Sequence, residues 1–502
     1  MKAFLMERDQ AFALDGKVAA KLPSNADLLV QDLELELLLQ AMAQGDEFVL
    51  QVARHAILTG ARNDVATILY RQAVLKDCLA QPGIVKELYA IAVEAIARER
   101  RVHFGLYSKS PEMVLRRACE VLEMFVDLLR QLRQVGVRAG GHFKAAAFQE
   151  MFSAIDQELG EEYLGQVEAH LRELELREGV LISAELGTGN KGTNYTLRKP
   201  ARAQRWGGRI FGGKGEEYSI TVAERDESGA RALWQVRDRG INLAANALAQ
   251  ALDHILEFFT RLRTELAFYI GCLNAHQVLV QMGEPVCFPE PSAQGERRHA
   301  CRGLYDVSLA LLLKEQVVGN DLAADGKGLV VITGANQGGK STFLRSVGQA
   351  QLMMQCGMFV AAEAFRANTC DGLYTHYRRE EDASMVSGKL DEELARMSEI
   401  VDQMTPNSMV LLNESFAATN EREGSEIARQ IVCALVESGV KVVFVTHLYV
   451  FARGLYDQGM AGALFLRAVR AAGGARTFRI QEGDPLETSY GEDLYGKVFG
   501  TG

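Results

Sequence analysis

The segment Gly334-Ala-Asn-Gln-Gly-Gly-Lys-Ser-Thr342 decides the fold class of this chain. It follows the apolar run 329–332, which predicts a buried strand, and precedes an apolar-periodic stretch from Phe343 that predicts a helix. Glycines at such a junction let main-chain N–H groups converge on phosphate oxygens, and the helix N-terminus adds its positive dipole end. The segment therefore predicts a phosphate-binding loop rather than a glycine-rich turn with an exposed lysine.

Two side chains of this loop have distinct expected roles. Lys340 is expected to reach the β- and γ-phosphates of ATP, and the Ser341 hydroxyl is expected to contact Mg²⁺. ATP and Mg²⁺ are therefore the predicted cofactors. The candidate nucleotide-binding residues are Gly334, Ala335, Asn336, Gln337, Gly338, Gly339, Lys340, Ser341 and Thr342.

Two later apolar runs end in side chains that suit ATP hydrolysis. The run 409–412 ends in Asn413 and Glu414. At this strand end an Asp usually faces Mg²⁺, so Asn413 is a candidate metal contact that brings no charge. Glu414 is the candidate general base for the attacking water. The run 442–445 ends in Thr446 and His447. Because α/β sheets bind ligands at the carboxyl ends of strands, His447 is the candidate catalytic contact to the γ-phosphate.

A second phosphate-facing helix is predicted after Ser387 and Gly388. Apolar residues at helical spacing follow this pair, which offers a hydroxyl and free N–H groups. Because the first loop already supplies one lysine and one helix terminus, this second one suggests ATP held between two subunits, as in ABC-type ATPases. Ser387 as a simple helix N-cap remains the alternative.

These motifs resemble the MutS family of DNA mismatch-repair ATPases, specifically over residues 317–499 and more weakly upstream. The resemblance implies a homodimer or heterodimer with composite ATP sites, DNA clamping and nucleotide-controlled conformational change. The segments that carry it are Val318-Gly-Asn-Asp321, the loop from Thr333 to Arg345, Phe444-Val-Thr-His447 with Phe451, Thr488-Ser-Tyr-Gly491, and Tyr269 to Ala275, which is similar to the helix that leads into the ATPase domain.

The chain also departs from the family pattern. Asn413 stands where the family has Asp, and residues 415–420 replace its GRGTS-type segment. The family's Ser-Thr-Phe signature aligns near Ser387, which leaves the register of that serine open. About 25 residues precede the first helical pattern, Leu28 to Met42, whereas a mismatch-reading domain needs about 100 residues at minimum. We therefore expect a divergent relative without the N-terminal mismatch-recognition domain, which does not read mismatches in the ordinary way.

Composition places this protein among cytoplasmic, helix-rich chains. The 502 residues carry a net charge of −10 and include only 9 prolines. No apolar run is long enough to span a membrane, and the first residues show no signal peptide. The eight cysteines are scattered without a C-x-x-C pair, which favours buried, reduced thiols over zinc sites or disulfides.

Upstream of the ATPase motifs, helical patterns surround a basic insert. Residues 26–178 predict successive helices, with one apolar stripe from Phe152 to Leu174, and a long helix is predicted from Ile241 to Leu273. Between them, Val180–Leu186, Tyr195–Arg198 and Tyr218–Val222 predict short strands. Residues 180–215 hold one acidic side chain, Glu185, against seven basic ones, and Trp206 and Phe211 lie among these. The candidate nucleic-acid-binding residues are Lys191, Arg198, Lys199, Arg202, Arg205 and Arg209.

The predicted fold is an α/β P-loop NTPase (ABC-type ATPase) domain preceded by a mainly α-helical lever/core domain with a small β-rich insert. The expected boundaries are 1–25 for an N-terminal segment, 26–320 for the helical part with an insert at 180–225, and 321–502 for the ATPase domain.

The favoured function is ATP-dependent clamping of DNA by a MutS-type dimer, related to repair or recombination. DNA would be recognised by its structure rather than its sequence, repair or recombination proteins are possible partners, and no membrane partner is expected. The alternative is an ATP-driven switch on a ribonucleoprotein or protein assembly, with the insert binding RNA or an acidic protein face.

Overall fold

The computed structural model describes residues 4–9, 12–14, 20–102, 110–177, 179–199, 219–379, 388–470 and 476–486. The chain forms two compact units, each built from several stretches of sequence. Lys86–His142 and Gln149–Arg263 form the first unit, and Phe4–Val85, Phe143–Phe148 and Thr264–Gly502 form the second. The described residues between Phe4 and Val85 therefore belong to the same compact unit as the C-terminal part.

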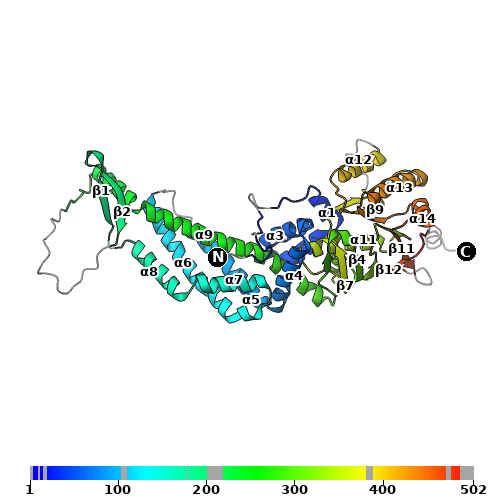
Figure 1. Cartoon of the computed structure of the whole chain (residues 1–502), viewed down its shortest axis with the longest axis horizontal. Helices are drawn as coiled ribbons and strands as arrows, with labels where there is room; N and C mark the ends of the chain where they lie inside the picture. The colour runs from blue at the N-terminus through cyan, green and yellow to red at the C-terminus, as the bar shows by residue number, and fades with distance from the viewer. Residues whose placement is uncertain are drawn as a thin grey trace. The chain divides into compact units, whose positions relative to one another are not determined.

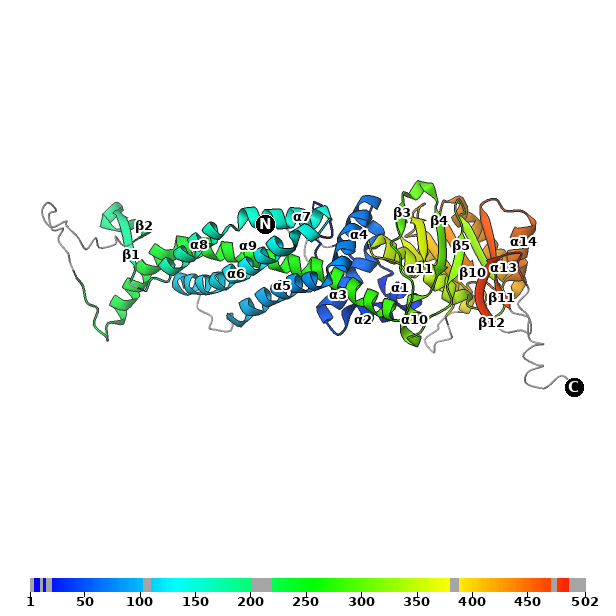
Figure 2. The ribbon, with the colours of Figure 1, turned by 90° about the horizontal axis from the view of Figure 1, so that it is seen from below.

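The first unit is helical and carries one β-hairpin (Figures 1 and 2). Helix α6 begins where Ser110 accepts a hydrogen bond from the N–H of Met113 and Pro111 takes the first helical position. Arg130 of α6 forms ion pairs with Glu161 and Glu168 of α8. The helices are α5 (Pro82–Val102), α6 (Pro111–Ala139), α7 (Ala146–Glu158), α8 (Glu161–Leu174) and α9 (Glu227–Gln281), of which α5, α7 and α9 continue into the second unit.

The hairpin of the first unit joins β1 (Leu181–Leu186) to β2 (Gly192–Arg198) in antiparallel register. Its turn contains Gly189 and Asn190 with positive φ angles of 71° and 57°, as glycine and asparagine tolerate. The hairpin packs on α9, because a Cβ at Gly240 would lie 2.4 Å from Ile182. Two of the three predicted strands are thus confirmed. The third is wrong over its described part, since Ser219–Val222 form no strand, and Tyr218 lies outside the described residues.

The second unit contains a six-stranded sheet in the order β12-β11-β6-β10-β9-β8, in which only the edge strand β12 is antiparallel to its neighbour. The members of this sheet are β6 (Leu329–Thr333), β8 (Leu373–Tyr377), β9 (Met409–Asn413), β10 (Lys441–Val445), β11 (Ala463–Arg470) and β12 (Arg476–Glu482). A smaller sheet has the order β3-β7-β4-β5 and consists of β3 (Glu290–Ser292), β4 (His299–Leu304), β5 (Asn320–Ala323) and β7 (Ala364–Asn368).

Helices cover both faces of the large sheet (Figure 1). On one face, Val331 and Phe444 pack with Val432 of α13 and Phe451 of α14 in a buried cluster. On the other face lies α11, since a Cβ at its Gly348 would meet Leu411 at 2.6 Å. The helices of this unit, besides the parts of α5, α7 and α9 that reach into it, are α1 (Ala26–Asp32), α2 (Leu35–Ala43), α3 (Glu47–Leu58), α4 (Val65–Ala80), α10 (Val307–Leu313), α11 (Lys340–Gln355), α12 (Lys389–Val401), α13 (Glu421–Glu437) and α14 (Tyr449–Asp457). This arrangement confirms the predicted α/β class of the C-terminal part.

Several expected helices have different bounds in the structure. The pattern from Leu28 to Met42 is two helices, because Glu34 takes a left-handed φ of 49° between α1 and α2. The stripe from Phe152 to Leu174 is divided between α7 and α8 at Gly160. The predicted helix from Ile241 to Leu273 is the middle of the longer α9. None of the helices in the described ranges combines the length and apolar character that a membrane span requires.

Candidate nucleotide site

The predicted phosphate loop joins β6 to α11 at the carboxyl edge of the large sheet. Gly334 leaves the strand with a φ of 112°, and a Cβ there would lie 3.0 Å from the main-chain nitrogen of Ala468. Gly339 precedes α11 with a φ of 89°. Both positions therefore need glycine, and the first N–H groups of α11, which have no acceptor within the helix itself, can bind an anion.

Lys340 lies under the loop. Its Nζ donates hydrogen bonds to the carbonyl oxygens of Gly334 and Ala335, at 2.8 and 2.9 Å. Burial lowers the pKa of Lys340 to about 8, and the charge of Glu414 opposes this shift. A phosphate bound in the loop would supply negative charge next to the ammonium group and favour its protonated form. The two hydrogen bonds thus hold the ammonium group of Lys340 at the expected position of the phosphates.

Ser341 and Asn413 are brought together, although 72 positions separate them. The Ser341 hydroxyl donates a hydrogen bond of 2.9 Å to Oδ1 of Asn413, at the end of β9. Both oxygens are of a kind that Mg²⁺ binds, but neither carries charge. In the described part of the chain, no three His, Cys, Asp or Glu side chains gather as a metal site. The donors fit a magnesium ion that is held mainly by the phosphates of its nucleotide.

Glu414 and His447 also meet at this edge. Nε2 of His447 lies 2.6 Å from Oε1 of Glu414, and because a carboxylate only accepts, Nε2 carries the hydrogen. This hydrogen bond lowers the pKa of Glu414 below its usual range, and burial opposes it. Glu414 itself has a left-handed φ of 55°, and its N–H bonds to the carbonyl of Val445 on β10. The two predicted catalytic side chains are therefore adjacent to each other and to the loop.

A cavity that the sequence did not reveal opens beside the loop. It has a volume of about 470 Å³, within the range of small-molecule sites. Its wall combines loop residues Gln337, Gly339 and Thr342 with apolar side chains that include Tyr305, Leu309, Val317, Val318 and Phe478. Asn320 fixes this wall by donating to the carbonyl of Phe478 at 3.1 Å and accepting from the N–H of Ile480 at 2.7 Å. Val318 and Asn320 of this wall belong to the segment Val318–Asp321, which carries part of the family resemblance but does not itself indicate a cavity.

The second helix that was predicted to face a phosphate, α12, is described from its N-cap Gly388 onward. Gly388 is the N-cap of α12, with extended backbone angles and no side-chain cap. Ser387 lies outside the described residues, so its candidate role stays a prediction.

Three of the six candidate nucleic-acid-binding residues lie on the described hairpin of the first unit. Lys191, Arg198 and Lys199 are all exposed. Nε of Arg198 donates to the Ser183 hydroxyl at 2.8 Å, and Lys199 forms an ion pair with Glu173. Arg202, Arg205 and Arg209 lie outside the described residues. The hairpin therefore presents three exposed cations, one of which already has a carboxylate partner.

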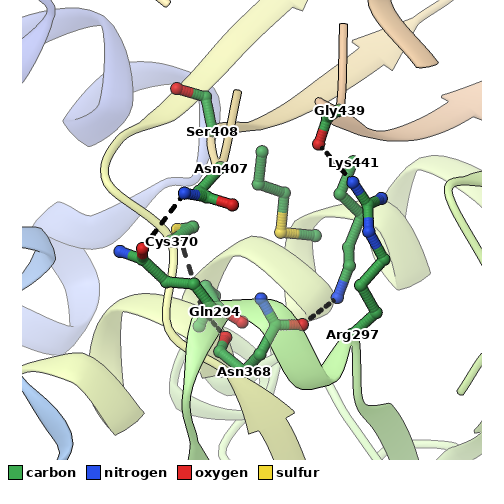
Figure 3. A pocket seen from close by; sticks show the side chains of 10 residues that line it. Gln294, Arg297, Asn368, Cys370, Asn407, Ser408, Gly439 and Lys441 are labelled. Carbon is green, nitrogen blue, oxygen red and sulfur yellow. Dashed lines mark hydrogen bonds between the residues drawn. The ribbon is translucent and has the colours of Figure 1, made fainter. Parts of the chain in front are cut away.

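A second polar cavity lies at the opposite, amino edge of the large sheet (Figure 3). Its volume of about 10 Å³ has room for about one water molecule. Lys441 donates to Oδ1 of Asn368 at 2.6 Å, and Arg297 donates to the carbonyl of Gly439 at 2.9 Å. Because these cations already have acceptors and the space is small, the cavity does not compete with the loop as a ligand site.

Comparison with known proteins agrees with this site. Residues 63–282 match the family model of the MutS2 N-terminal domain, and residues 330–478 match that of MutS domain V. Both are models of MutS-type domains, and together they match most of the chain. The second match contains the loop, Asn413, Glu414 and His447, whereas the part of the cavity wall from Tyr305 to Asn320 precedes it.

Individual relatives agree with the family match. Endonuclease MutS2 of Thermus thermophilus is 32% identical over 180 residues, which are 36% of this chain and 23% of the relative. DNA mismatch repair protein MutS of Thermus aquaticus is 29% identical over 272 residues, 54% of this chain and 32% of the relative. DNA mismatch repair protein MutS of Chloroflexus aurantiacus is 26% identical over 214 residues, which are 42% of this chain and 22% of the relative. The chain thus spans a third or less of the length of these MutS-family relatives.

Proposed function

We propose that this chain is a MutS-type ATPase that couples the binding and hydrolysis of ATP to the binding of DNA. The observation that carries this proposal is the convergence of Lys340, Ser341 and Glu414 at one edge of the large sheet. A phosphate loop alone would support nucleotide binding. The adjacent carboxylate adds a base for hydrolysis.

Each side chain of this set has one task in the proposed reaction. Lys340 exchanges its two carbonyl acceptors for phosphate oxygens, and the α11 N-terminus adds main-chain donors. Mg²⁺, when bound with ATP, neutralises phosphate charge. The side-chain oxygens of Ser341 and Asn413 would contact this ion. Glu414 accepts a proton from the water that attacks the γ-phosphate, and His447 orients Glu414.

The cavity beside the loop is the proposed site of the nucleotide base. It begins at Gly339 and Thr342, next to the phosphate position, and continues between Val317 and Phe478. A flat aromatic base would bury its faces against these apolar side chains. The cavity therefore supports a complete nucleotide rather than inorganic phosphate as the ligand.

DNA binding and dimerisation complete the proposal. The exposed cations of the β1–β2 hairpin suit phosphates of a nucleic-acid backbone, which carry no sequence information. The relatives named mismatch repair proteins support a role in DNA repair or recombination. A second subunit would bring the Gly388 end of α12, with Ser387, to the ATP held by the first.

One binding panel tests this proposal. Purified protein is titrated with perfect duplex, mismatched duplex, branched DNA and structured RNA, without nucleotide, with ADP and with ATP. We expect DNA binding whose affinity changes between ADP and ATP, together with ATP hydrolysis that Lys340→Ala abolishes. DNA affinity that is identical in all three nucleotide states would contradict the coupling.

The second candidate is an ATP-driven switch that acts on a protein or ribonucleoprotein assembly. Its support is the exposed apolar residues on the first part of α9, where Trp234 is 60% and Leu243 71% exposed, because such side chains suit a protein partner. Binding to structured RNA alone, or to no nucleic acid in any nucleotide state, would favour this candidate.

A further inference from the structure

His376 is a buried histidine outside the predicted motifs that contacts two functional elements at once. It lies on β8 and is 0% exposed. Its Nδ1 is 2.7 Å from the hydroxyl of Ser415, the residue after Glu414. Its Nε2 is 3.0 Å from the carbonyl oxygen of Glu393, on α12. One ring therefore bridges the turn that carries the candidate base and the helix that begins at Lys389.

The chemistry of these two contacts fixes the tautomer of the ring. A carbonyl oxygen only accepts, so Nε2 must carry the hydrogen that it donates to Glu393. Burial lowers the pKa of His376 to about 4, and the charge of Arg396 adds to this effect, so the ring is neutral near pH 7. Nδ1 is then a bare acceptor, and the Ser415 hydroxyl has one hydrogen for two acceptors, Nδ1 and the main-chain carbonyl oxygen of His376, each at 2.7 Å. Ser415 thus contacts β8 through both the side chain and the main chain of His376.

Phe416 supplies a second connection between the same elements. Its ring stacks on the His376 ring, with centroids 5.5 Å apart and planes inclined by 18°. Its main-chain N–H donates to the Glu393 carboxylate. On the opposite side, a Cβ at Gly424 of α13 would lie 2.4 Å from its carbonyl oxygen. The residues that follow Glu414 are thus held between β8, α12 and α13.

The backbone of this turn needs such support. Glu414 and Phe416 have φ angles of 55° and 65°, a region that costs non-glycine residues free energy and persists only when surrounding contacts impose it. If those contacts are lost, the turn can relax, and the Glu414 carboxylate would move with it.

We propose that His376 is a positioning residue that ties α12 to the turn of Glu414, so that the position of α12 sets the alignment of the general base. This inference rests on the proposed function, because it assumes that Glu414 serves hydrolysis. The contacts of His376 also give α12 a second role, in communication between two nucleotide sites. When the Gly388 end of α12 engages the nucleotide of another subunit, the same link carries that engagement to Glu414 of its own site.

Two substitutions of His376 each remove one of its two hydrogen bonds, to Ser415 or to Glu393. His376→Gln places its amide nitrogen near the Nε2 position, which keeps a donor for the Glu393 carbonyl and removes the acceptor for Ser415. His376→Asn does the reverse. Ser415→Ala removes the hydroxyl and with it both of its contacts to His376, at Nδ1 and at the main-chain carbonyl oxygen. The controls are His299→Gln and Ser425→Ala, because both are buried in the same unit and the described structure gives His299 Nε2 and Ser425 Oγ no hydrogen-bond partner.

We expect both His376 variants to lower the kcat for ATP by about 10- to 100-fold, the size of effect that a displaced catalytic group produces. The Kd for ATP should stay within about twofold of the wild-type value, since neither hydrogen bond of His376 involves the phosphate loop. His376→Gln and Ser415→Ala together should cost no more than Ser415→Ala alone, because Ser415→Ala already breaks the contact that His376→Gln removes. Unchanged kcat, or parallel losses of kcat, ATP affinity and Tm, would overturn the inference.

Hydrogen exchange tests the link without relying on hydrolysis. His376→Asn should raise exchange at the amides of Ser415 and Phe416, and His299→Gln should not. Unchanged exchange there overturns the link even in a chain that proves to hydrolyse no ATP. Faster exchange in a chain without ATPase activity would retain the mechanical link and reject the proposed function, so the two failures are distinguishable.

Discussion

The Nε2 atom of His447 lies 2.6 Å from Oε1 of Glu414, so the candidate general base is hydrogen-bonded to a side chain from the end of the neighbouring strand. The residues come from the ends of neighbouring strands, β9 and β10. The bond lowers the pKa of Glu414, which keeps the carboxylate ionised, and it leaves Oε2 for water. We therefore expect His447 to act on hydrolysis through Glu414 as well as through any contact to the γ-phosphate.

Glu414→Gln should separate nucleotide binding from hydrolysis. The amide keeps the shape of the side chain but cannot accept the proton, so kcat should fall by at least about 10²-fold, the usual contribution of a general base. The Kd for ATP should change little, and ATP-bound protein should accumulate. Single-turnover hydrolysis and equilibrium binding measure the two quantities. Glu426→Gln, at an exposed position of α13, is the control, and wild-type turnover by Glu414→Gln would remove Glu414 from the mechanism.

Asn413→Asp should strengthen the response to Mg²⁺. The present amide contributes no charge beside Ser341, so the ion depends on the phosphates of ATP. A carboxylate at the same position adds a preferred magnesium ligand, and the Mg²⁺ concentration for half-maximal hydrolysis should fall. Superimposable Mg²⁺ titrations of the two proteins would show that residue 413 does not face the metal.

The buried lysine of the loop should make ATP binding depend on pH. The pKa of Lys340 is lowered to about 8 in the free protein, and bound phosphates should raise it. Binding then takes up a proton above this pH, and ATP affinity should fall by up to about tenfold per pH unit as pH rises above about 8. Calorimetric titrations in buffers of different ionisation enthalpy measure the uptake. Lys340→Met should bind weakly with no such proton uptake, and uptake that persists in this variant would assign the effect to another group.

These three sites could be expected from sequence because their signals are local. A strand, glycines and a helix in succession specify the loop around Lys340, and a short apolar run that ends in Asn413 specifies a strand end. The features that were missed depend on distant residues. The break at Glu34 is held by tertiary contacts, in which Gln349 donates to the Leu33 carbonyl and Arg345 pairs with Glu34, while the apolar periodicity continues through it.

The roles of two further residues also depend on contacts with residues that are distant in sequence. Phe478 reaches the cavity beside the loop from 139 positions beyond Gly339, and nothing near Phe478 in sequence indicates a ligand. His376 is a single histidine between Thr375 and Tyr377 of β8, and its importance follows from its contacts to Ser415 and Glu393. Conversely, Ile220 lies in a stretch with strand propensity but is 90% exposed, and propensity without a partner strand does not form a sheet.

Glu265 should give the second unit a pH-dependent stability. Its carboxyl group accepts hydrogen bonds from the N–H groups of Leu5, Met6 and Phe12, and burial raises its pKa to about 8. Because the unfolded value is about 4.3, its stabilising contribution is full below that pH and is lost as pH rises through the folded pKa. Between about pH 5 and 7 the loss should be about 1.4 kcal/mol per unit.

Denaturant unfolding across this range compares wild type with Glu265→Gln, whose free energy of unfolding should lack that slope. Glu257→Gln, an exposed position on the same helix α9, is the control. An identical slope in wild type and Glu265→Gln would assign the pH dependence to other groups.

The hairpin cations should separate DNA binding from hydrolysis. Lys191, Arg198 and Lys199 are exposed on β2 and its flanks. Each contact to a DNA phosphate releases counterions, so replacing all three by Ala should reduce the slope of log K against log salt by up to about 3 and weaken binding equally for all sequences. Lys199 should contribute least, because it must first leave Glu173. Basal ATPase activity should survive, since these residues belong to the first unit and the nucleotide site to the second.

A charge-matched control distinguishes phosphate contacts from a change in net charge. Arg302, Arg366 and Arg429 are at least 45% exposed in their side chains and lie in the second unit. Replacing these three by Ala removes the same charge and should leave the salt slope unchanged. If both triple variants lose affinity alike, the effect is one of overall charge. If the hairpin variant keeps its slope and affinity, the hairpin is a solvated face or a protein-docking surface, and DNA clamping by this element is wrong.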